Sequence, residues 1–188
     1  MLGRYTWSGL WSLFLMSALL QHAWTIILAF NDIGWLTART NAWDAIGVLC
    51  YGLLFALMES ALLFLAFLIL GLLLPRRWEP ERRIAALSCL VLVLSLWAIL
   101  SQWFFLAQFR FPDAIIGFLA ESGHPLWLIY GLVLSVLTAS VALPLWAVAR
   151  PGGGLKFVGG MIERLGLLAT LYLFFDVVAA VVVLIRNL

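Results

Sequence analysis

Apolar residues run along this chain in five long stretches, separated by short segments that hold most of the charged residues. A bilayer core of about 30 Å needs about 20 helical residues, so each stretch is long enough to cross it. The pattern predicts five transmembrane helices, at residues 7–30, 43–74, 84–107, 125–149 and 161–185. We therefore expect an all-α, polytopic membrane helical bundle that forms one integral membrane domain over residues 1–188.

Small and polar residues fall on one face of each predicted helix when successive residues are placed about 100° apart. Small side chains let two helix backbones approach closely, and polar groups avoid lipid by facing the same contact. We therefore expect these faces to point into the bundle. The helix-packing positions predicted in this way are Gly52, Ala56, Gly131, Ser135 and Gly166.

Four polar side chains within the apolar stretches are the candidates for function. Glu59 lies near the middle of the second stretch, whereas Asp176, His22 and Gln102 lie toward one end of theirs. An ionisable group in hydrocarbon costs several kcal/mol unless it is paired, protonated or reached by water. Each carboxylate is therefore interpreted as a hydrogen-bonding group between helices, as a partner for another subunit or as a carrier of protons or cations.

Composition agrees with a membrane protein and argues against several other classes. Hydrophobic residues make up 65% of the chain and charged residues 11%, a balance that suits lipid rather than water. The net charge of +2 is too small to indicate nucleic-acid binding, so we expect no nucleic-acid partner. His22 is the single histidine within a predicted span, and we predict no metal site. The sequence does not identify a cofactor.

The basic residues predict an orientation, because cytoplasmic loops of membrane proteins carry an excess of Lys and Arg. Arg76, Arg77, Arg82 and Arg83 all lie in the segment between the second and third spans. Placing this segment in the cytoplasm puts eight of the eleven basic residues there: Arg4, Arg76, Arg77, Arg82, Arg83, Arg150, Lys156 and Arg164. The N-terminus is then cytoplasmic and the C-terminus outside, in a bacterial-type cytoplasmic (inner) membrane. Anionic lipid headgroups are the natural partners of the four loop arginines.

Two connecting segments differ from ordinary polar loops. Residues 151–154, Pro-Gly-Gly-Gly, indicate a turn between the last two spans, since glycine and proline favour turns. Residues 111–124 contain a short amphipathic pattern. This pattern fits either a short helix lying at the membrane surface or an irregular loop.

The chain contains no recognisable catalytic motif, such as HExxH or GxSxG, and no P-loop. Its short loops and small-residue faces favour a non-catalytic integral membrane subunit or scaffold that packs with other membrane subunits in a larger complex. One alternative is a small transporter or channel subunit that uses Glu59 and Asp176 as intramembrane protonatable groups. A second alternative is a membrane-embedded, lipid-modifying enzyme, and enzyme activity is the less favoured interpretation.

The orientation can be tested by labelling single cysteines with a membrane-impermeant thiol reagent. Cysteines that replace Arg77 or Gly153 should be protected when the reagent is added outside intact cells. Cysteines that replace Ala38 or Asn187 should react. Labelling of the residue-77 site from outside would reverse the predicted orientation.

Overall fold

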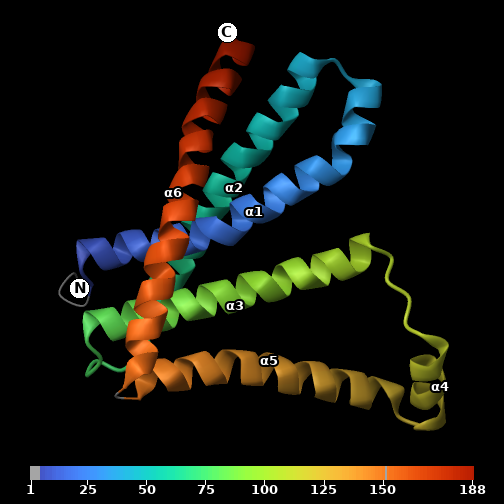
Figure 1. Ribbon diagram of the computed structural model, residues 1–188, viewed down its shortest axis with the longest axis vertical. Helices are drawn as coiled ribbons and strands as arrows, with labels where there is room; N and C mark the ends of the chain where they lie inside the picture. The colour runs from blue at the N-terminus through green and yellow to red at the C-terminus, as the bar shows by residue number, and fades with distance from the viewer. Residues whose placement is uncertain (1–4, 151) are drawn as a thin grey trace.

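The computed structural model describes residues 5–150 and 152–188, and this part of the chain contains helices and no strand. The helices are α1 (Trp7–Arg39), α2 (Ala42–Leu70), α3 (Pro80–Leu106), α4 (Asp113–Glu121), α5 (Pro125–Ala149) and α6 (Gly153–Asn187) (Figure 1). All of them except α4 are long and apolar enough to cross a membrane. The predicted helical membrane bundle with five spans is therefore confirmed.

The ends of the helices differ from the predicted spans. The α5 bounds agree with the prediction, but α1 continues to Arg39 instead of residue 30, and α6 begins at Gly153 instead of residue 161. The hydrophobic pattern marks the length that suits hydrocarbon, whereas a helix continues past the hydrocarbon until a cap or a turn stops it. At the start of α1 the Thr6 side chain accepts a hydrogen bond from the Gly9 amide.

The first helix is central to the fold, because α1 packs against α2, α3 and α6. The largest apolar cluster joins α1 to α3, α5 and α6, and its buried members include Met16, Ala86 and Ala169. In Figure 1, α3 lies between α1 and α5, and α4 lies at the far end of α5. Residues 111–124 were expected to form either a short helix or an irregular loop, and they contain the short helix α4. The location of α4 at the membrane surface stays a prediction.

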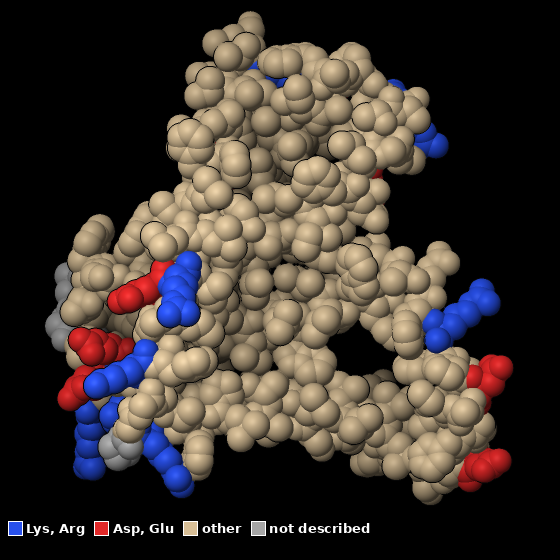
Figure 2. All heavy atoms as spheres, in the orientation of Figure 1, with Lys and Arg blue, Asp and Glu red and all other residues tan. Residues whose placement is uncertain are grey.

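Charged side chains are concentrated near the ends of the long helices (Figure 2). In this view, most Lys, Arg, Asp and Glu side chains gather at the lower left, where α3 and α6 begin, and smaller groups lie beside α4 and at the top. The broad middle of the visible face is uncharged, which suits helices that lie in hydrocarbon. Which end faces the cytoplasm stays a prediction, and Arg4 lies outside the described residues.

One loop arginine has a role that the sequence analysis did not predict. Arg83 is only 1% exposed, and its guanidinium donates hydrogen bonds of 3.0 Å to the carbonyl oxygens of Gly71 and Pro75. The last carbonyls of a helix have no partner within the helix, so a donor from α3 can stabilise the end of α2. The Arg83 guanidinium thus bonds the end of α2, whereas Arg76 and Arg77 are exposed, and headgroup binding by the loop arginines stays a prediction.

The glycine-rich connection between α5 and α6 is shorter than predicted. Gly153 and Gly154 form the beginning of α6, and Pro151 lies outside the described residues. A Cβ atom at Gly154 would overlap the backbone oxygen of Ala147, whereas one at Gly153 would meet nothing within 4 Å. The start of α6 therefore approaches the end of α5 so closely that position 154 requires glycine.

This close approach predicts opposite effects at two adjacent glycines. Gly154→Ala should lower the free energy of unfolding by about 1–3 kcal/mol, because the added methyl group overlaps a backbone oxygen. Gly153→Ala is the matched control, and it should be neutral or stabilise by up to about 1 kcal/mol. Thermal unfolding in a mild detergent measures both. Equal melting temperatures for the two variants would show that the helices do not approach as described.

Candidate functional site

A buried contact between two polar side chains joins α1 to α6. His22 is 0% exposed and Asp176 is 3% exposed. The His22 Nε2 atom lies 2.9 Å from Oδ2 and 3.0 Å from Oδ1 of Asp176. The other ring nitrogen, Nδ1, lies 2.8 Å from the carbonyl oxygen of Ala18 on the preceding turn of α1. The sequence analysis singled out both residues without indicating that they pair.

The hydrogen bonds define where the protons of this pair lie. A carbonyl oxygen can only accept, so Nδ1 of His22 carries a hydrogen and donates it to Ala18. A further proton then lies between Nε2 and the carboxyl group of Asp176, held either as imidazolium and carboxylate or as imidazole and carboxylic acid. Both arrangements have no net charge. The pair therefore avoids the large cost of burying a net charge in an apolar interior.

Apolar and aromatic groups enclose the pair. The Tyr172 ring, one turn before Asp176 on α6, stacks on the His22 ring with a centroid distance of 6.2 Å and an interplanar angle of 12°. Leu19 and Ala179, on neighbouring turns of α1 and α6, are also buried. With water kept out, the contact between His22 and Asp176 is stronger than it would be on a protein surface.

Two tryptophans bond across helices, and the sequence analysis did not single them out. The Trp24 indole N–H on α1 donates to the side-chain oxygen of Gln102 on α3. The Trp97 indole N–H on α3 donates to the Ser140 hydroxyl on α5, with a distance of 3.0 Å. Gln102 thus connects two helices although the residue is exposed. The sequence did contain a signal for these two bonds. Interfacial tryptophans are found at the ends of membrane spans, whereas Trp24 and Trp97 lie inside theirs.

Glu59 does not point into the bundle, which differs from the expectation. It is exposed on α2 among the exposed side chains of Phe55, Met58 and Leu62. No hydrogen bond or ion pair involves Glu59 in the described structure. The buried stripe of α2 includes Ala56 and Ser60, and Glu59 is rotated out of it by about 100° from Ser60. Glu59 and Asp176 therefore do not form a common site.

The small residues expected at helix contacts divide into two groups. Ala56 is buried, and Cβ atoms added at Gly52 and Gly166 would lie 3.4 Å from side chains of α1. Gly131 and Ser135 of α5 are instead exposed, and an added Cβ at Gly131 would meet nothing within 4 Å. The expectation of an inward small-residue face is wrong for α5 within this chain. The buried contact of α5 lies nearer its end, at Val148.

The site offers no obvious place for a metal ion, and known proteins supply no analogy. Among the described residues, no group of three or more His, Cys, Asp or Glu side chains is arranged to hold a metal. Comparisons of the chain with protein-family models, curated proteins and solved structures gave no match. Functional inference therefore depends on the geometry of this chain.

Substitutions at Asp176 test the hydrogen-bonding role of the pair. In Asp176→Asn, the side-chain amide can donate to Nε2 of a neutral His22, so the fold should persist. In Asp176→Leu, Nε2 is left buried without a partner, which should lower stability by about 1–3 kcal/mol. Val177→Leu, at an exposed neighbouring position, is the control. Equal melting temperatures of Asp176→Leu and Asp176→Asn in mild detergent would oppose this interpretation.

Proposed function

We propose that this protein is a non-catalytic integral membrane subunit that packs against other membrane helices through its α2 and α5 surfaces. The exposed, unpaired Glu59 near the middle of α2 is the observation that carries the proposal. Glu59 lies eleven residues before the end of α2, which corresponds to about 16 Å along the helix. This depth lies far from both ends of a membrane-spanning helix.

Lipid tails cannot satisfy a carboxyl group at this depth. Acidic residues in hydrocarbon cost several kcal/mol, and they normally pair with another polar or basic group. The described chain supplies no such group to Glu59, and its neighbours Phe55, Met58 and Leu62 are apolar. A membrane helix of a partner subunit with a Lys, Arg or amide side chain at the same depth would satisfy it. The apolar neighbours of Glu59 would form the rest of the contact.

The exposed face of α5 gives independent support. Gly131, Ser135, Thr138 and Ala142 are all exposed and lie on one side of the helix. Small residues at this spacing are typical of close contacts between membrane helices. Because α3 and the other helices leave this face uncovered, a helix from a partner subunit can approach the α5 backbone there.

The large exposed surface also supports assembly. The accessible surface of the described chain is 12591 Å². A compact soluble protein of 21.0 kDa would expose about 9,000 Å². Figure 2 shows an opening through the molecule between α3 and α5, which contributes to this excess. The bundle is thus incomplete as a packed unit, and lipid or other helices cover its open faces.

Partner association should depend on Glu59. Purification from the native membrane in mild detergent should recover the chain with at least one larger membrane protein. Glu59→Leu should weaken this association by about 150- to 5,000-fold, since loss of one member of a buried pair costs about 3–5 kcal/mol. Glu59→Gln separates two partner chemistries, because it preserves a hydrogen bond with an amide but removes the attraction to a cation.

Glu163→Leu is the matched control for this experiment. Glu163 is also exposed, but it lies near the start of α6, away from the middle of the helix. The control should keep the partner at the native level. Recovery of a monodisperse chain without partners, or equal association of the Glu59→Leu and Glu163→Leu variants, would refute the proposed assembly.

Proton movement is the second candidate function, and the buried contact between His22 and Asp176 is the observation that favours it. Histidine and aspartate side chains inside membrane bundles are common members of proton pathways. The Asp176→Asn variant distinguishes the two functions, because it keeps the hydrogen bond but removes an exchangeable acid. In liposomes, native proton flux that is lost in this folded variant would favour transport. Absence of native flux would favour the subunit.

A further inference from the structure

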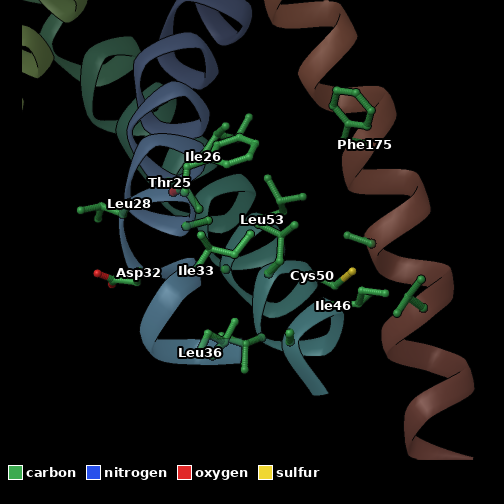
Figure 3. A pocket seen from close by; sticks show the side chains of 18 of the residues that line it. Thr25, Ile26, Leu28, Asp32, Ile33, Leu36, Ile46, Cys50, Leu53 and Phe175 are labelled. Carbon is green, nitrogen blue, oxygen red and sulfur yellow. The ribbon is translucent and has the colours of Figure 1, made fainter. Parts of the chain in front are cut away.

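An apolar cavity of about 760 Å³ lies between α1, α2 and α6 (Figure 3). Its walls come from the second half of α1, the first half of α2 and the second half of α6. Ile33, Ile46, Leu53 and Val178 are typical of these walls. In Figure 3 the Asp32 side chain points away from α2 and α6, so the space between the three helices is bordered mainly by hydrocarbon groups.

The cavity lies near the end of the bundle where α1 connects to α2. Trp35 lines it, and the guanidinium of Arg39 lies over the Trp35 ring at 4.6 Å from the centroid. No ion pair involves Arg39 in the described structure. Arg186, one turn beyond the lining residue Val182, is instead paired with Asp44. Of the two arginines near this cavity, Arg186 therefore has an acidic partner, and Arg39 has none among the described residues.

We propose that this cavity binds an acyl chain of a phospholipid whose phosphate group contacts Arg39. The volume falls within the range of about 300–1,000 Å³ that is typical of ligand sites. Apolar walls exclude water and polar ligands, and the surrounding bilayer supplies acyl chains at high concentration. Phosphate groups lie at the level where transmembrane helices end, and a guanidinium binds phosphate through paired hydrogen bonds.

Charge distribution favours a phosphate over a neutral or cationic headgroup. The carboxylate of Asp44 is paired with Arg186, and Asp32, which is among the lining residues, points away from α2 and α6. Arg39 remains to attract an anion at the rim. Three helices line the cavity, which is open on one side, so a lipid bound there contacts three helices instead of one exposed helix face. This inference is independent of the proposed subunit function, because the residues that line the cavity include neither Glu59 nor any residue of α5.

Native mass spectrometry after reconstitution and mild-detergent extraction tests the site. The protein is reconstituted separately with dioleoylphosphatidylglycerol and with dioleoylglycerol, which has the same chains but no phosphate. The native chain should retain one phosphatidylglycerol molecule and little dioleoylglycerol. Ala29→Trp, which places a bulky ring in the cavity wall, and Arg39→Gln should each reduce retention by ~10-fold or more.

Two controls separate the cavity from the general protein surface. Ala120→Trp adds the same ring to exposed α4, and Arg110→Gln removes an exposed arginine between α3 and α4. Both should retain phosphatidylglycerol at the native level. Melting temperatures check folding, and Ala45→Trp replaces Ala29→Trp if the latter is unfolded.

Two sets of results would count against the lipid site. Equal retention of phosphatidylglycerol by the native chain and a folded cavity variant would overturn the proposal, because the lipid would then be bound elsewhere. Equal retention of dioleoylglycerol, or no effect of Arg39→Gln, would overturn the assignment of the phosphate to Arg39. If both tryptophan variants are unfolded, the comparison of the two lipids on the native chain decides the proposal.

Discussion

The arrangement depends on one constraint: polar groups in hydrocarbon must find their partners within protein. The helical backbone satisfies most of these groups, and several hydroxyl groups bond within the same helix. Ser17 donates to the Leu13 carbonyl oxygen, and Ser60 donates to that of Ala56. Other polar groups are satisfied across helices, as in the His22–Asp176 contact. The helix contacts therefore follow the positions of a few polar side chains as well as apolar packing.

The two parts of the molecule satisfy this constraint to different extents. Around α1 the His22–Asp176 pair is buried, and the apolar side chains form clusters with α2, α3 and α6. The outer face of α2 and the face of α5 that carries Gly131 are uncovered. This contrast supports a stable central unit with open surfaces for assembly, and the buried pair fits a structural role in that unit.

The sequence predicted the helical class and the five spans, because hydrophobic length and periodicity are local properties, and it left a helix or a loop open for the α4 segment. It also selected His22, Asp176 and Gln102 as intramembrane polar residues. Pairing could not be predicted, since nothing local connects His22 with a residue 154 positions away. The direction of Glu59 was also missed. Several faces of α2 are apolar, so small residues alone did not define which face packs against α1.

The role of Arg83 escaped sequence analysis for a related reason. Four arginines in one short loop resemble a topology signal, and only the folded chain shows that one of them bonds the end of α2. The face of α5 with small residues shows another limit of prediction from sequence. A pattern that favours helix contact does not indicate whether the other helix belongs to the same chain.

The contact between the first and last helices has a consequence for biosynthesis. His22 is inserted long before Asp176 exists, because the two residues are separated by 154 positions. At synthesis rates of about 5–20 residues per second, the interval is roughly 8–30 s. During this time the His22 ring has to be neutral, hydrated or held by other protein groups. Arrival of α6 then completes the buried pair, so an incomplete chain differs chemically from a finished one at the centre of its bundle.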